Sequence, residues 1–196
     1  MTPPDGVDGL IAAGGDLYAA GLVTSHGGNL SQRLAPPDSE RGGAPGALIS
    51  AAGAMLGRLT IDDLVAVDSS GAATDSGPAP SSNTAIHLAI YAAHDPAAAI
   101  VHAHPVYATA RTLADGADTI EPANFEGQLL LPRVPVLPEG SEETPQAIAA
   151  ALDAGSAPIV MVRGHGSFAI GADVWAALML SSALEEAAQI LTLAGR

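Results

Sequence analysis

The chain has 196 residues, 48 % of them hydrophobic, so it is long enough to bury a core and too apolar for a disordered chain. Its formal net charge of −14 would repel a polyanion, and no basic cluster offsets that charge, so we expect no nucleic-acid partner. There is no cysteine, which excludes disulfides, thiolate nucleophiles and cysteine-bound metals; all seven basic residues are arginine, which excludes chemistry through a lysine imine.

Nothing in the sequence indicates a membrane or secreted protein. No apolar run approaches the length of a membrane span, and the first residues, MTPPDGVDG, have neither the basic nor the apolar segment of a signal peptide. We therefore expect a cytoplasmic protein with no membrane partner. The length and the lack of an internal repeat predict a single domain over residues 1–196.

The first part of the chain predicts one helix and then short strands. An apolar stripe predicts a helix over residues 7–21, and loops rich in Pro, Gly and Ser are expected at 35–46 and 69–82. Thr60 followed by Asp63 resembles a short helix start. Short apolar runs predict three strands, over residues 26–34, 47–50 and 64–68.

The rest of the chain alternates helices and strands irregularly. Strands are expected at 97–104, 133–137 and 158–166, and helices at 83–95, 106–116, 144–155 and 172–195. Ser82 is the expected N-cap of the first of these helices, and Glu185 and Glu186 are expected to face solvent on the last. This order favours a mixed α/β sandwich over a regular Rossmann arrangement.

Two histidines stand one residue apart in the apolar run IVHAHP, residues 100–105. On a strand, side chains at i and i+2 point to the same side, so His102 and His104 would converge. His165 lies between two glycines in VRGHGSF, where the chain can turn sharply and a ligand can approach closely. Three imidazoles with an open position are typical of a catalytic divalent-metal site; three hydrogen-bonded polar residues near the edge of the core are the alternative.

Zn²⁺ is the first choice of metal, because imidazole suits it and the chain has no thiolate. Mn²⁺, Co²⁺ and Fe²⁺ are alternatives. Three turns of small residues add an anion-binding prediction: Gly28 and Asn29 in one, Gly53 in the second, and Ser81 and Ser82 at the start of an expected helix. Taken alone, each of these segments is more simply explained as an ordinary turn or helix cap. Taken together with the predicted metal site, they make an anionic substrate credible.

The motifs GNLSQR, SSNTAIHLAIY, IVHAHPVYAT and GHGSFAIG, in that order, resemble the class II aldolase/adducin family over almost the whole chain. The resemblance implies a three-layer α/β/α sandwich around a largely antiparallel sheet, and a homotetramer with active sites between subunits. It implies a small sugar phosphate as the substrate and His102, His104 and His165 as the metal ligands. The family's phosphate-binding positions fall on Gly28, Asn29, Gly53, Ser81 and Ser82.

The sequence departs from the family at a catalytic position. The family's Ser-Ser-Glu ends in a carboxylate that acts as general acid and base, but here Asn83 takes its place, and an amide has no proton to exchange near neutral pH. Ala52 also replaces the usual hydroxyl residue of a phosphate loop. Glu126, in NFEGQLL, is the candidate replacement, with a solvated loop glutamate as the alternative and His26 as a weaker candidate.

The predicted function is a metal-dependent lyase of the aldolase type. It would cleave a carbon–carbon bond of a small phosphorylated keto sugar through a metal-stabilised enediolate, with the metal in the role that other aldolases give to a lysine imine. A decarboxylase or dehydratase of the same family is the alternative, because decarboxylation needs no base to begin. A non-catalytic, adducin-like binding module is a third possibility, against which three intact metal ligands argue.

Overall fold

The structure is a computed structural model that describes residues 6–34, 46–95, 97–114, 116–153 and 155–195. The loop predicted at 35–46 therefore lies, except for its last residue, outside the described residues. Within the described part of the chain, one sheet has the strand order β3-β2-β1-β4-β8-β7-β6-β5. All neighbouring strands are antiparallel except β6 and β7, so the prediction of a largely antiparallel sheet is confirmed.

The elements follow the predicted order closely. The strands are β1 (Asn29–Leu34), β2 (Gly46–Ser50), β3 (Leu64–Val67), β4 (Ala99–Ala103), β5 (Thr119–Ile120), β6 (Val134–Leu137), β7 (Ile159–Val162) and β8 (Gly166–Gly171). The α-helices are α1 (Gly6–Ala19), α2 (Thr84–Ala93), α3 (Val106–Ala114), α4 (Phe125–Leu130), α5 (Pro145–Ala151) and α6 (Val174–Leu193). Short 3₁₀ turns are η2 (Leu56–Arg58), η3 (Ile61–Asp63) and η4 (Ser141–Glu143).

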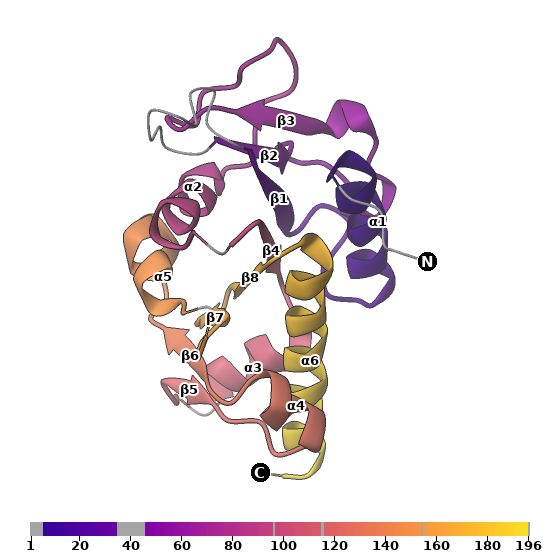
Figure 1. Cartoon of the computed structure of the whole chain (residues 1–196). Helices are drawn as coiled ribbons and strands as arrows, with labels where there is room; N and C mark the ends of the chain where they lie inside the picture. Colours follow the sequence, from indigo (N-terminus) through magenta and orange to yellow (C-terminus); the bar gives the residue numbers. More distant parts are fainter. Residues whose placement is uncertain (1–5, 35–45, 96, 115, 154, 196) are drawn as a thin grey trace.

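Helices cover both faces of the sheet (Figure 1). Helices α2 and α5 lie on one face, whereas α1, α3, α4 and α6 lie on the other. Because strand side chains alternate between faces, β4 contributes Ile100 to the core under α2 and α5, and Val101 to the core under α6. The predicted three-layer α/β/α sandwich is therefore confirmed, and His102 leaves the sheet on the same face as Ile100.

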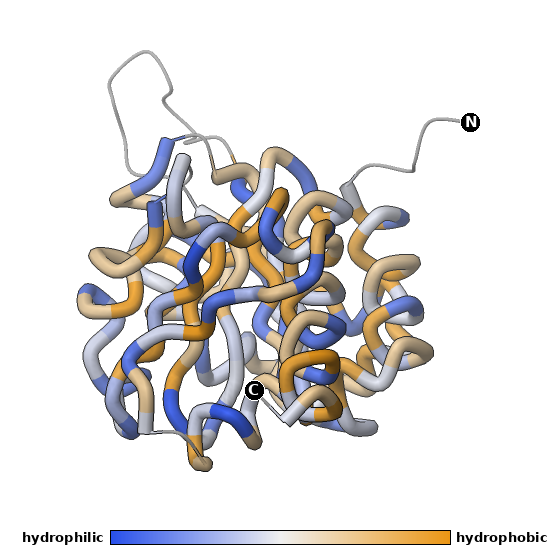
Figure 2. Tube along the Cα trace, turned by 90° about the horizontal axis from the view of Figure 1, so that it is seen from below, coloured by the Kyte–Doolittle hydropathy of each residue, from blue (hydrophilic) through white to orange (hydrophobic). Residues whose placement is uncertain are grey.

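The last helix corrects one expectation. By length and composition α6 is apolar enough to cross a membrane, contrary to the prediction that no apolar segment approaches the length of a membrane span. Half of that segment is buried inside the protein, where α6 packs on the sheet, and core packing accounts for its apolar character. In Figure 2 hydrophobic and hydrophilic stretches are interspersed along the chain.

Two local predictions have different outcomes, and three short elements were not predicted. The helix start at Thr60 is confirmed, because its N–H donates to the Asp63 carboxylate at 2.9 Å at the beginning of η3. The N-cap of α2 is Asn83, so the prediction of Ser82 is wrong by one residue. Strands β5 and β8 and helix α4 were not predicted: β5 has only two residues, and β8 and α4 are short apolar runs that contain glycine.

Candidate metal centre

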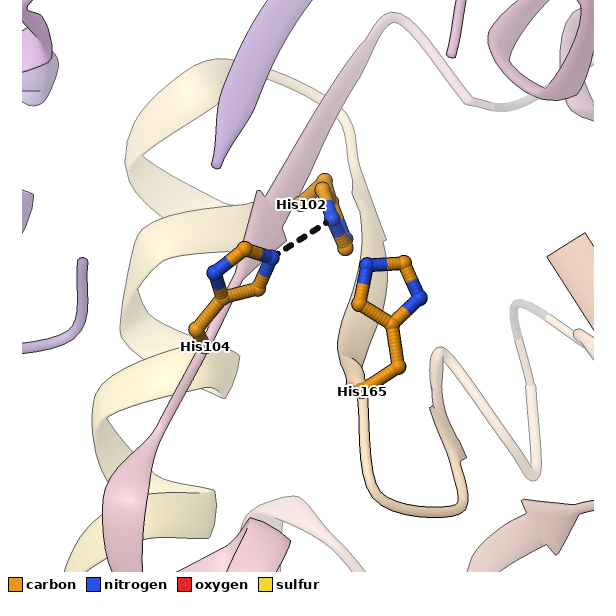
Figure 3. Close-up of side chains that lie close together, drawn as sticks. All are labelled: His102, His104 and His165. Atoms are coloured by element: carbon orange, nitrogen blue, oxygen red, sulfur yellow. Dashed lines mark hydrogen bonds between the residues drawn. The ribbon is translucent and has the colours of Figure 1, made fainter. Parts of the chain in front are cut away.

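Three histidine rings from two distant segments meet at the end of β4. His102 lies on β4, His104 follows it, and His165 lies in the turn between β7 and β8. The ring centroids are 4.7, 4.9 and 5.2 Å apart. Figure 3 shows the rings pointing toward one another, and one nitrogen of each lies within 4.8 Å of the others. The structure thus brings together the three histidines that the sequence singled out.

Hydrogen bonds assign the proton on two of the rings. Nδ1 of His102 lies 2.9 Å from the carbonyl oxygen of Ser167, which can only accept, so Nδ1 carries the hydrogen and donates it. Burial, together with the neighbouring His104 and His165, holds the pKa of His102 well below its ordinary value, so the ring is neutral and its Nε2 has a free lone pair. Nε2 of His104, 3.0 Å away, then donates to it. Neutral imidazole is the form that binds a metal.

Glycines leave the room that the His104 ring fills. A Cβ at Gly27 would lie 2.9 Å from Nδ1 of His104, and a Cβ at Gly166 would lie 2.7 Å from its Cδ2. Gly164, with a φ of +69°, takes the left-handed conformation that turns the chain between β7 and β8. The two glycines beside His165 therefore do different things: the first makes the turn, and the second makes space for His104.

The chemistry of these residues fits a divalent cation. Two nitrogens bound to one tetrahedral zinc at about 2.0–2.1 Å are roughly 3.3 Å apart. The Nε2 atoms of His102 and His104 are 3.0 Å apart, close to that spacing. The backbone carbonyl that holds Nδ1 of His102 is the kind of outer contact that orients a metal-binding imidazole. Three imidazoles also leave coordination positions for water or substrate.

The first of the three turns predicted to bind an anion lies against the histidines. A Cβ at Gly28, whose φ is +75°, would lie 2.7 Å from the carbonyl oxygen of His102. Asn29 stands directly opposite His102 in the β1–β4 ladder, so the two side chains leave the same face of the sheet. Oδ1 of Asn29 is buried and has no hydrogen-bond partner among the described residues.

The other two turns predicted to bind an anion are hydrogen-bonded to each other. The N–H of Ala52 donates to the carbonyl oxygen of Ala79 at 2.9 Å, which brings Gly53 beside the turn of Ser81 and Ser82. Strand β2 leads into the first of these turns and is antiparallel to β1, so its end lies beside the beginning of β1. All three predicted turns therefore lie near the same end of the β1–β2 pair.

The two candidate catalytic positions lie on different helices. Asn83 is half-buried at the start of α2, and its N–H donates to Oγ of Ser81 at 3.2 Å. Glu126 is exposed in the first turn of α4, and the main packing partner of this helix is α6. Among the described residues, no hydrogen bond or ion pair joins Glu126 to the three rings. A single chain therefore does not bring Glu126 to the cluster.

Two other glutamates have contacts that the sequence did not reveal. Glu185, expected to face solvent, instead accepts hydrogen bonds from the backbone N–H groups of Tyr107 and Ala108, both at 3.0 Å. These are first-turn amides of α3, the helix after β4, so the carboxylate caps that helix. Glu142 lies 3.7 Å from Nδ1 of His165. Neither contact has a local signal, because each joins segments far apart in the chain.

A known family accounts for this combination of fold and histidines. The family profile described as "Class II Aldolase and Adducin N-terminal domain" matches residues 8–192. The chain belongs to the class II aldolase and adducin family. The resemblance inferred from the four motifs is therefore confirmed. Class II aldolase enzymes depend on a divalent metal, and the cluster of His102, His104 and His165 could hold one.

Class II aldolase relatives with different activities are similar over nearly the whole chain. Methylthioribulose-1-phosphate dehydratase of Acidiphilium cryptum is 32 % identical over 186 residues, covering 90 % of this chain and 84 % of that protein. The 3-oxo-tetronate 4-phosphate decarboxylase of Haemophilus influenzae is 30 % identical over 194 residues, covering 95 % and 87 %. The crystal structure of L-fuculose-1-phosphate aldolase from Thermus thermophilus is 33 % identical, with a TM-score of 0.81, covering 94 % and 92 %. The chain is thus an enzyme of the class II aldolase superfamily, among relatives named for phosphorylated substrates.

Proposed function

We propose that the protein is a metal-dependent lyase that acts on a small phosphorylated keto sugar. The observation that carries this proposal is the convergence of His102, His104 and His165 within 4.8 Å, with Gly28 and Asn29 beside them. A non-catalytic binding module has no use for three imidazoles that face one point, so we prefer an enzyme to an adducin-like scaffold.

The three histidines are the proposed metal ligands, with Zn²⁺ as the first choice and Mn²⁺, Co²⁺ or Fe²⁺ as alternatives. A bound divalent cation supplies positive charge beside the carbonyl and hydroxyl oxygens of a keto sugar, which stabilises the charge of an enediolate. Backbone N–H groups of the small-residue turns bind the phosphate. The proposed phosphate-binding residues are Gly28, Asn29, Gly53, Ser81 and Ser82.

Glu126 is the proposed general acid and base, since Asn83 cannot exchange a proton near neutral pH. Glu126 shares the exposed side of α4 with Phe125, which is 84 % exposed, and Leu129, which is 70 % exposed. Large apolar side chains this exposed are typical of an interface. We propose a homotetramer in which α4 packs on a neighbouring subunit and brings Glu126 to the metal centre of that subunit.

Loss of water is the first candidate reaction, supported by the 32 % identity to a methylthioribulose-1-phosphate dehydratase. The carboxylate of Glu126 takes the proton from the carbon next to the carbonyl, and the electron pair of that bond forms the enediolate. The enediolate then expels the hydroxyl on the following carbon, and the protonated Glu126 gives its proton to that hydroxyl, which leaves as water. One acid–base residue is enough for the whole reaction.

Aldol cleavage, the reaction expected from the motifs, is the second candidate, supported by the 33 % identity to L-fuculose-1-phosphate aldolase. It reaches an enediolate by breaking a carbon–carbon bond once a hydroxyl proton is removed. Decarboxylation reaches the same species without a base, and the 30 % identity to a 3-oxo-tetronate 4-phosphate decarboxylase supports it.

Metal analysis followed by product analysis tests the proposal. The purified chain, reconstituted with Zn²⁺, is incubated with a panel of small keto-sugar phosphates and, to test decarboxylation, phosphorylated keto acids. A product lighter by one water identifies the dehydratase, dihydroxyacetone phosphate identifies the aldolase, and CO₂ identifies the decarboxylase. Failure to bind any divalent metal would overturn the proposal.

A cytoplasmic location remains a prediction of the sequence.

A further inference from the structure

A carboxylate lies directly behind one of the three histidine rings. Oε1 of Glu142 is 3.7 Å from Nδ1 of His165. In Figure 3, Nδ1 of His165, the nitrogen next to the ring carbon that joins the side chain, faces away from His102, whereas the other nitrogen faces it. Glu142 therefore lies on the side of the ring opposite the point where the three imidazoles converge.

Both groups contain buried polar atoms without a partner. Among the described residues, Nδ1 of His165 and Oε2 of Glu142 are buried and make no hydrogen bond. A buried polar atom that stays unpaired is unfavourable, because it has lost its hydrogen bonds to water. The pair is about 1 Å farther apart than a hydrogen bond requires. A small rotation of either side chain would therefore satisfy a donor on the ring and an acceptor on the carboxylate together.

The fold holds the turn that carries Glu142 beside the turn that carries His165. Strand β6 leads into η4 and pairs with β7, which leads into the histidine turn. The N–H of Arg163 donates to the carbonyl oxygen of Leu137 at 3.0 Å, which ties the two strand ends together. Within η4, Oγ of Ser141 donates to the carbonyl oxygen of Pro138 at 2.7 Å and closes the turn.

We propose that Glu142 is a positioning residue of the metal centre. Its carboxylate accepts the Nδ1–H of His165 when the opposite ring nitrogen binds the metal, an inference that rests on the proposed three-histidine site. A carboxylate in this place fixes the tautomer and orientation of the imidazole and makes the ligating nitrogen more basic. The carbonyl oxygen of Ser167 holds His102 in the same way, at 2.9 Å. Two of the three rings are thus oriented by an acceptor on the side away from the metal: His102 by a neutral carbonyl group and His165 by a charged carboxylate.

Zinc affinity is the measurement that tests this role. The Kd for Zn²⁺ is obtained by competition with a chromogenic chelator for wild type, Glu142→Ala and Glu142→Gln. We expect Glu142→Ala to bind zinc about 10–100-fold more weakly. Glu142→Gln should lose less, because its amide oxygen still accepts a hydrogen bond but carries no charge. Glu143→Gln is the matched control, because Glu143 is the next residue of the same turn and is exposed; it should bind zinc as wild type does.

A second readout separates positioning from general stability. Visible spectra of the Co²⁺-loaded proteins should change for the Glu142 variants and not for Glu143→Gln, because the spectrum reports the geometry of the ligands. Circular dichroism checks folding, and Glu142→Gln, which keeps the side-chain volume, serves if Glu142→Ala does not fold. If neither Glu142 variant binds zinc more weakly than Glu143→Gln, the positioning role is overturned while the metal site stands. A wild-type chain that binds no divalent metal overturns the proposed function itself.

Discussion

Two buried histidines on the same face of the sheet, His87 and His102, have opposite surroundings. The Phe168 ring lies between them: it stacks on His102 with centroids 4.2 Å apart and meets the edge of His87 at 6.3 Å. Nδ1 of His87 and the hydroxyl of Tyr91 each lie 2.7 Å from Oγ of Ser31. His102 instead turns its Nε2 toward two other imidazoles.

The difference separates a structural histidine from a candidate ligand. We call Ser31, His87 and Tyr91 the serine cluster and the three converging imidazoles the histidine cluster. The serine cluster joins α2 to β1 through neutral side chains, and among the residues that the structure describes no second imidazole or carboxylate is hydrogen-bonded to them. Burial alone therefore does not indicate chemistry, whereas several ligand atoms facing one point do.

The largest expected effect comes from removing a ring of the histidine cluster. His102→Ala takes away one of three proposed ligands, so we expect activity to fall to background. Zinc affinity should fall by more than the roughly 10–100-fold typical of losing an outer partner. Zinc content and product formation are measured together.

His87→Gln in the serine cluster is the matched comparison, because it changes a buried histidine on the same face. It should keep full zinc content. Equal loss of zinc from both variants would contradict the distinction between the two clusters.

The next effect tests whether the histidine cluster obtains its acid–base group from α4. Glu126→Gln keeps the size of the side chain but cannot take a proton, so turnover should fall about 10²–10⁴-fold with zinc content unchanged. Glu121→Gln, another exposed glutamate, is the control and should keep wild-type turnover. Full activity of Glu126→Gln would remove Glu126 from the mechanism.

The serine cluster should appear in the pH dependence of stability. Burial lowers the pKa of His87 from 6.5 to about 3. Between these two pH values the unfolded chain binds a proton on His87 that the folded chain does not bind. The contribution of this group to the free energy of unfolding therefore does not change with pH above about pH 6.5, and it decreases as the pH falls toward about 3. The slope for one proton is at most about 1.4 kcal/mol per pH unit.

Urea unfolding of the metal-free protein at several pH values measures this slope. His87→Gln should be about 1–3 kcal/mol less stable near pH 7, because Ser31 loses a partner, and should show a shallower fall in acid. All other side chains are the same in both proteins, so their contribution cancels in the comparison. Identical slopes would show that His87 does not cause the acid sensitivity.

The smallest expected effect concerns the support behind the histidine cluster. Glu185→Ala removes the cap of α3, the helix that follows His104, and should cost about 0.5–2 kcal/mol of unfolding free energy. Glu186→Ala is the control, because Glu186 is exposed on the same helix, and it should change stability little. Thermal unfolding of both variants checks the difference; equal destabilisation would argue against a specific cap.

Local patterns predicted what depends on neighbouring residues. The period of two in IVHAHP correctly placed His102 and His104 on one side, and the apolar stripes gave most helices within a few residues. The same reasoning was wrong for Glu185, because a polar residue on an amphipathic helix is predicted to face solvent unless its distant hydrogen-bond partner is known. It also passed over Glu142 and the serine cluster, whose partners lie on other elements.

The sequence alone determined which chemistry is available: without cysteine or lysine, imidazoles and carboxylates are left to bind a metal or move a proton. Only the tertiary structure decided which of them meet. His165 reaches the other two because β4 and β8, far apart in the chain, are neighbours in the sheet. Strand order arises from long-range packing of the two cores, and no local periodicity encodes it.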